Sequence, residues 1–132
     1  MRAGAFAAAA LALIFAPAAE GRTPTASWCL TAPERTGPCR RVHGRITAYN
    51  GNPTLRIWVV GTHRVLGVHG RTWQESETGD MLPVNVRQAL GRNAFLTRVF
   101  ADFLICPLTR ERAGWMQYVC VAAARNLYVQ RF

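Results

Sequence analysis

The chain has 132 residues, a length that favours one domain, and half of its residues are hydrophobic. It carries sixteen basic residues, all of them arginine, against seven acidic residues, so the formal net charge is +9 at pH 7. The absence of a Cys-x-x-Cys motif disfavours a thioredoxin-like redox site and a zinc ribbon. A domain this basic is attracted to polyanions, and the planar, forked guanidinium group suits phosphate and carboxylate.

The N-terminal residues have the pattern of a bacterial secretory signal. Arg2 supplies the positive start, residues 5–16 form an apolar run, and the small residues at 16–19 suit a cleavage site. The run is too short for a membrane-spanning helix, which needs about 20 apolar residues. We therefore predict a signal peptide at residues 1–19 and export to the periplasm or the medium. An uncleaved N-terminal anchor is the alternative.

Four cysteines follow, namely Cys29, Cys39, Cys106 and Cys120. In an exported chain an even number of cysteines indicates disulfides, and four cysteines allow three pairings. We predict the bonds Cys29–Cys39 and Cys106–Cys120, because each would close a loop of about ten to fifteen residues and contribute about 3 kcal/mol. The predicted role of all four cysteines is structural.

Residues 20–41 are predicted to form an irregular N-terminal arm that precedes a β domain at residues 42–132. Three prolines and Gly37 interrupt any regular period in this arm. Trp28 is expected to pack onto the domain rather than to bind a ligand.

The centre of the sequence has the pattern of three antiparallel strands: residues 42–49, 54–60 and 64–68. Residues 50–53 are a strong turn signal, and Gly61-Thr62 fits a two-residue hairpin turn. Side chains alternate between the two sides of a strand, and residues opposite each other on paired strands share a side. With these turn lengths one side is apolar and forms the core: Leu55, Ile57, Val59, Leu66 and Val68. The other side is cationic and aromatic: Arg45, Tyr49, Arg56, Trp58 and His63.

The remainder of the chain adds one short helix and further strands. Residues 70–82 are polar and predicted as a loop, and Pro83 can open a helix that runs to Leu90. Strands are predicted at three places: residues 95–105, 116–122 and 127–132. This element order is that of an OB-fold, in which nucleic-acid and sugar ligands lie over the second and third strands. We predict a mostly β fold, a small five- to six-stranded antiparallel barrel of OB-like type with one short helix and two disulfides.

Two segments carry a resemblance: VHGRITAYNGNPTLRIWVVGTHRVLGVHG and VFADFLICPLTRERAGWMQYVCVAAARNL. At both, the chain resembles small exported bacterial proteins without an assigned activity. The resemblance implies export and a shared fold, and it carries over no catalytic residue. The shorter segment RVLGVHG is also similar to a strand of thermonuclease-like OB-folds. His69 stands where the metal-binding aspartate of those folds would be and no Pro-Glu follows, which counts against nuclease activity.

The three histidines do not form a metal site in this arrangement. His63 and His69 share a side but lie about 20 Å apart along the chain, and His43 and His63 lack a third ligand. We therefore predict no metal and no cofactor. No nucleophile motif or paired carboxylate is present, so enzymes are the less favoured class.

Asp102 is unusual because it lies among apolar residues in a predicted strand. A buried carboxylate needs a partner. We predict a structural ion pair with an arginine such as Arg45, Arg56 or Arg98. A general base with a raised pKa is the alternative.

The cationic and aromatic side is the best functional signal in the sequence. Proteins that bind single strands combine a cationic groove with aromatic side chains on which bases stack. We therefore predict a non-enzymatic module that binds an anionic partner, either nucleic acid or an acidic glycan, through Arg45, Tyr49, Arg56, Trp58 and His63. One alternative is a structural or interaction protein of the cell envelope, in which a protein covers this side. A second alternative is a hydrolase that uses Asp102.

Overall fold

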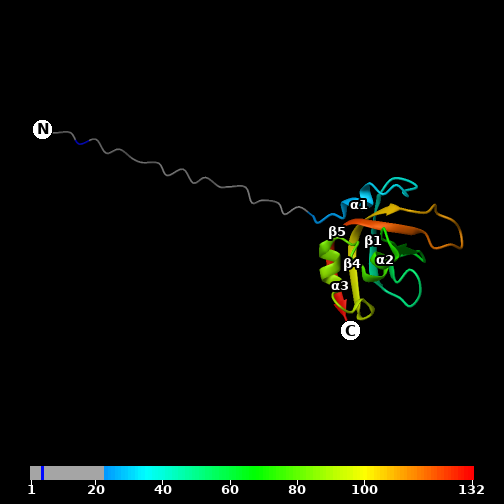
Figure 1. Ribbon diagram of the computed structural model, residues 1–132. Helices are drawn as coiled ribbons and strands as arrows, with labels where there is room; N and C mark the ends of the chain where they lie inside the picture. Colours follow the sequence, from blue (N-terminus) through cyan, green and yellow to red (C-terminus); the bar gives the residue numbers. More distant parts are fainter. Residues whose placement is uncertain (1–3, 5–22) are drawn as a thin grey trace.

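The computed structural model describes Gly4 and residues 23–132 (Figure 1), so the predicted signal peptide at residues 1–19 lies outside the described residues except for Gly4. The elements in chain order are α1 (Ser27–Leu30), β1 (Arg40–Ala48), β2 (Leu55–Val59), β3 (Val65–Val68), α2 (Trp73–Thr78), α3 (Val84–Leu90), the 3-10 helix η1 (Ala94–Leu96), β4 (Thr97–Pro107) and β5 (Tyr118–Arg131). The fold is mostly β, as predicted. Within the described part, no helix has the length and apolar character needed to cross a membrane.

The five strands hydrogen-bond in a closed ring, in the order β1-β2-β3-β5-β4. The pairs β1–β2, β2–β3, β1–β4 and β4–β5 are antiparallel, but β3 and β5 are parallel, with Gly67 opposite Tyr118. The predicted all-antiparallel arrangement is therefore wrong at this pair. The long connection through α2, α3 and β4 allows β5 to begin at the same end of the ring as β3, which a short hairpin turn does not permit.

The register predicted for the first three strands is confirmed. Ile57 pairs with Leu66 across β2–β3, and Arg45 pairs with Trp58 across β1–β2. A slip of one residue would exchange the two sides of β2 and move Arg56 and Trp58 into the core. The chemistry of the side chains therefore specifies this register.

The apolar sides of the strands point into the ring and form the core. Four of the five predicted core residues are buried, and Val59 is partly buried against them. Residues of α3 and of the segment before it join the same cluster. The largest fully buried side chains include Phe103, Ile46, Ile57, Leu66 and Ile105.

Residues 23–132 contain three α-helices rather than the one predicted. The predicted helix at residues 83–90 corresponds to α3, which begins after Pro83. The predicted loop at residues 70–82 instead contains α2. The hydroxyl of Thr72 accepts a 3.1 Å hydrogen bond from the amide of Glu75, and Gly79 ends the helix with φ of 77°, a conformation that glycine favours. The Thr-x-x-Glu spacing is a capping signal that was present in the sequence.

The two strands predicted at 116–122 and 127–132 form one strand, β5. Its register against β4 shifts twice, between Phe100 and Asp102 and between Leu104 and Ile105. Asn126 adopts φ of 58°, which asparagine tolerates better than most residues. These irregularities allow one long strand to continue where the sequence pattern suggests a break.

The N-terminal arm lies against β5 and includes the short helix α1 (Figure 1). Thr25 bridges to Ala123, and the amide of Ala26 donates a 2.7 Å hydrogen bond to the carbonyl of Ala122. Trp28 packs against the core as predicted, and its indole N–H donates a 3.0 Å hydrogen bond to the carbonyl of Met81.

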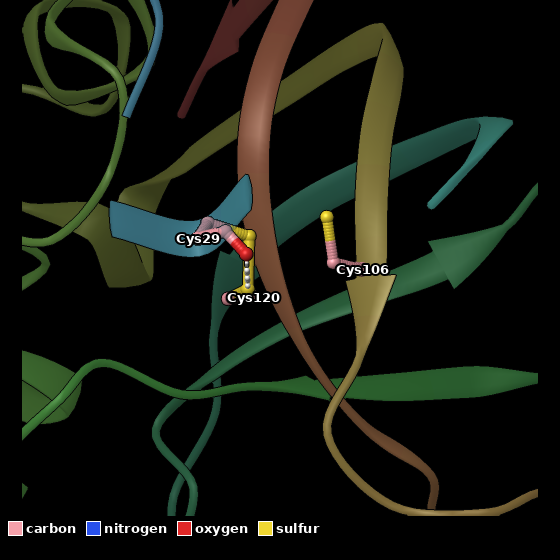
Figure 2. Close-up of side chains that lie close together, drawn as sticks. All are labelled: Cys29, Cys106 and Cys120. Atoms are coloured by element: carbon pink, nitrogen blue, oxygen red, sulfur yellow. Dashed lines mark hydrogen bonds between the residues drawn. A yellow bond between two sulfur atoms is a disulfide. The ribbon is translucent and has the colours of Figure 1, made fainter. Parts of the chain in front are cut away.

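All four cysteines form disulfides, but the predicted pairing is wrong: the bonds are Cys29–Cys120 and Cys39–Cys106. Cys106 and Cys120 are direct neighbours across β4–β5, yet each bonds to a cysteine of the arm. The arm places Cys29 over β5, and the start of β1 lies beside the end of β4, which brings Cys39 to Cys106. Figure 2 shows the Cys29–Cys120 bond with the Cys106 side chain nearby. Sequence proximity is a poor guide here because long-range strand pairing determines which cysteines meet.

Candidate functional site

The predicted cationic and aromatic side, here called the basic–aromatic face, is made of Arg45, Tyr49, Arg56, Trp58 and His63. Arg45 comes from β1, and Arg56 and Trp58 come from β2. Arg45 lies directly opposite Trp58. Their neighbours Ile46 and Ile57 point into the core, so the side chains of this face point outward. His63 is exposed in the turn between β2 and β3.

The arginines of this face lie over its aromatic rings. The guanidinium carbon of Arg45 is 5.0 Å from the ring centroid of Trp58, and that of Arg56 is 5.1 Å from the ring centroid of Tyr49. Arg45 Nη2 also donates to the Tyr49 hydroxyl at 3.4 Å, and Arg56 Nε donates to the carbonyl of Pro53 at 3.0 Å. These contacts hold the two guanidinium groups in place without neutralising their charge.

The positive charge of the face is uncompensated. The ion pairs within residues 23–132 are His43–Asp102, Arg64–Glu111 and Arg71–Glu75. Neither Arg45 nor Arg56 has a carboxylate partner among these residues. Arg45 Nε is also one of two buried side-chain nitrogens in the described part that have no hydrogen-bond partner. An anion placed beside these side chains could accept charge-assisted hydrogen bonds from the outer, Nη ends of the guanidinium groups.

Two aromatic residues that the sequence interpretation missed extend the face across the next strands. Phe100 of β4 lies opposite Arg45, and Tyr128 of β5 lies opposite Phe100. The two rings are 6.3 Å apart between centroids, and Tyr128 is 62% exposed. Trp58, Arg45, Phe100 and Tyr128 therefore form one row over four strands. The alternation within residues 97–107 places Phe100 outward, but only the β1–β4 pairing reveals its neighbour.

On the other side of β2, the face continues over Gly67. Gly67 lies opposite Arg56 on one side and opposite Tyr118 on the other. A Cβ atom added at Gly67 would lie 2.7 Å from Pro53 Cγ, 2.9 Å from Tyr118 Cδ1 and 3.0 Å from Met116 Sδ. The missing side chain lets these three residues close over β3.

Gly67→Ala is expected to lower the free energy of unfolding by about 1 to 3 kcal/mol, because the added methyl group overpacks this contact. Chemical denaturation measures the change. Gly37→Ala is a matched control, since the nearest atom to its added Cβ is Pro107 Cγ at an ordinary 3.6 Å. If Gly67→Ala is as stable as the control, the close packing over Gly67 is wrong.

Within residues 23–132, Asp102 pairs with His43 and not with an arginine, contrary to the prediction. Its side chain is 35% exposed; Oδ1 lies 2.9 Å from Nδ1 of His43, and Oδ2 accepts a 2.8 Å hydrogen bond from Asn126. These hydrogen bonds, first from Asn126 and then from His43, hold the pKa of Asp102 below its ordinary value. This direction is opposite to the raised pKa expected for the alternative, a general base. Outward-pointing positions on β4 are not covered here, which is why the carboxylate needs no buried partner.

Asp102→Asn is expected to change how stability depends on pH. A carboxyl group whose pKa is lowered by folding contributes stability that is fully present above its unfolded pKa of about 4 and is lost as pH falls through the folded-state pKa. The variant should therefore be less stable than the wild type near neutral pH, and the difference should shrink in the acid range. Thermal unfolding over this pH range measures it. A difference that stays constant down to low pH would show that the carboxylate is not stabilised by folding.

One group of metal-ligating atoms occurs in the described part, and it consists of sulfur atoms. The sulfurs of Cys29, Cys106 and Cys120 lie within 4.8 Å of one another, as Figure 2 shows for their side chains. All three belong to disulfides. A metal takes the thiolate form of cysteine, so these atoms do not make a metal centre in the oxidised protein.

Comparison with known proteins finds no matching family model, no similar curated protein and no similar solved structure.

Proposed function

We propose that this protein is an exported, non-enzymatic module that binds an anionic polymer, a nucleic acid or an acidic glycan, through the basic–aromatic face. The observation that carries the proposal is the pair of guanidinium groups of Arg45 and Arg56, stacked on aromatic rings and without carboxylate partners among the described residues. The net charge of +9 favours the approach of a polyanion.

The fold and the disulfides support this proposal. We propose an OB-like barrel for the ring, because a parallel pair of third and fifth strands and a helix between the third and fourth strands agree with that architecture. Ligands of such folds lie over the strands that carry Arg56 and Trp58 here. Two disulfides favour an oxidising compartment, which agrees with export.

Binding to a labelled single-stranded oligonucleotide and to a labelled acidic glycan tests the proposal. Fluorescence anisotropy between about 50 and 200 mM salt is expected to show an affinity that falls linearly on a log–log plot as counterions are released. A lack of binding to both polymers at the lowest salt concentration would refute the proposal.

A protein partner in the cell envelope is the second candidate function. An apolar patch favours it: Phe95, Leu96 and Phe132 are 57%, 50% and 69% exposed, and the amide of Phe132 donates to the carbonyl of Leu96 at 3.0 Å. A stable complex recovered with the wild type and lost with Leu96→Ser would support this function. Recovery of the same complex with that variant would count against it.

A further inference from the structure

Beyond Gly67 the molecule has a hollow of about 460 Å³ beside the loop between β4 and β5. Its lining combines two arginines, two aromatic rings, a thioether and a hydroxyl: Arg110, Arg112, Trp115, Tyr118, Met116 and Thr109. The volume lies within the range of about 300 to 1,000 Å³ that is common for small-ligand sites. No carboxylate of residues 23–132 lines it. The hollow is therefore a concave, cationic and aromatic site.

Trp115 is the most solvent-exposed tryptophan of the chain, at 67%. The guanidinium carbon of Arg112 lies 4.7 Å from its ring centroid, the same arrangement as in the basic–aromatic face. Neither Arg110 nor Arg112 forms an ion pair within residues 23–132. A large exposed indole next to two arginines without ion pairs in residues 23–132 is typical of a surface that binds an aromatic, anionic group.

Tyr118 connects the hollow to the rest of the molecule. It lies opposite Gly67, which lies opposite Arg56, so no side chain of β3 separates Tyr118 from the basic–aromatic face. On its other side, the ring of His69 packs on Tyr118 with centroids 4.2 Å apart. Nε2 of His69 is the second buried nitrogen in the described part without a hydrogen-bond partner. Tyr118 and Gly67 thus link the hollow to Arg56 in one strip across three strands.

We propose that this hollow is a base-binding subsite for single-stranded nucleic acid that also contacts Arg56. One base stacks on Trp115 or Tyr118, and the adjoining phosphates contact Arg110 and Arg112. The inference rests on the proposed function and selects nucleic acid from its two polymer classes. Flat rings paired with guanidinium groups suit alternating bases and phosphates, and every base has a face that can stack. An acidic glycan would use the arginines but offers no aromatic face to Trp115.

Trp115→Ala tests the subsite with a labelled oligothymidylate as the probe. Base stacking contributes about 1 to 3 kcal/mol, so we expect the affinity to fall about 5- to 150-fold. Trp73→Ala is the matched control, since Trp73 is also exposed, at 58%, but lies on α2 outside the strip. Both variants remove an exposed side chain, and unchanged thermal unfolding confirms that the fold is intact.

A second variant, Arg110→Ala with Arg112→Ala, separates charge from stacking. Each lost phosphate contact is expected to reduce the slope of log affinity against log salt by about 0.7 for a single strand.

If Trp115→Ala binds oligothymidylate like the wild type while Arg56→Ala binds it more weakly, the subsite is refuted and the proposed function stands. If the wild type binds only an acidic glycan, or if Trp115→Ala weakens glycan and oligothymidylate binding equally, the assignment to nucleic acid is wrong. If neither polymer binds the wild type, the proposed function fails together with the subsite.

Discussion

A variant in which all four cysteines are replaced by serine is expected to be largely unfolded at room temperature. The two bonds close long stretches of chain, with sequence separations of 91 and 67 residues. In the chain-entropy model the removal of both costs about 8 kcal/mol, which is comparable to the total stability of a small domain at about 5 to 15 kcal/mol. Circular dichroism and chemical denaturation would measure the loss.

Each disulfide is expected to contribute less to stability when the other one is intact, because the two bonds share one short loop. With Cys39–Cys106 intact, Cys29–Cys120 closes an effective loop of only about 25 residues, so Cys29→Ser with Cys120→Ser should cost about 3 to 4 kcal/mol. The matched control is Ser27→Ala, an exposed position of α1, which should change little. Peptide mapping of the wild type provides the check on connectivity. A peptide linked through Cys106–Cys120 would contradict the structure.

Arg56→Ala combined with Trp58→Ala is expected to weaken binding of an anionic single strand by about 100-fold or more. The indole loses a stacking contact worth about 1 to 3 kcal/mol, and the guanidinium loses a charge-assisted phosphate contact. Loss of the arginine alone should also reduce the slope of log affinity against log salt concentration by about 0.7. Anisotropy titrations at two salt concentrations measure both effects.

The control for this double variant removes one arginine and one tryptophan that lie outside the basic–aromatic face. Arg87 on α3 and Trp73 on α2 are both exposed and lie outside the basic–aromatic face. Arg87→Ala combined with Trp73→Ala lowers the net charge by the same amount but is expected to retain most of the affinity. An equal loss in both double variants would mean that net charge, not the face, determines binding.

Local patterns predict the first three strands and the candidate site well. Turn lengths and alternation were sufficient to bring Arg45 opposite Trp58, because a hairpin relates residues that are close in the sequence. The capping signal at Thr72 and Glu75 was also present in the sequence. The helix α2 was therefore predictable, although our prediction placed a loop there.

Contacts between distant segments could not be predicted in the same way. The parallel pair β3–β5, the position of Phe100 opposite Arg45 and both disulfides depend on how β4, β5 and the arm return to the first strands. No local period encodes such pairings. The error about Asp102 has the same origin: its outward orientation, and its contact with His43, follow from the β1–β4 register rather than from its apolar neighbours in sequence.

Nuclear magnetic resonance of the isotope-labelled protein, titrated with a single-stranded oligonucleotide, tests most directly whether the basic–aromatic face binds the polymer. The side-chain N–H signals of Trp58 and Arg45, together with the amides of β1 and β2, are expected to shift, and the indole signal of Trp73 is expected to stay in place. Saturating binding that shifts signals of α2 and α3 while those of Trp58 and Arg45 stay unchanged would contradict the proposal.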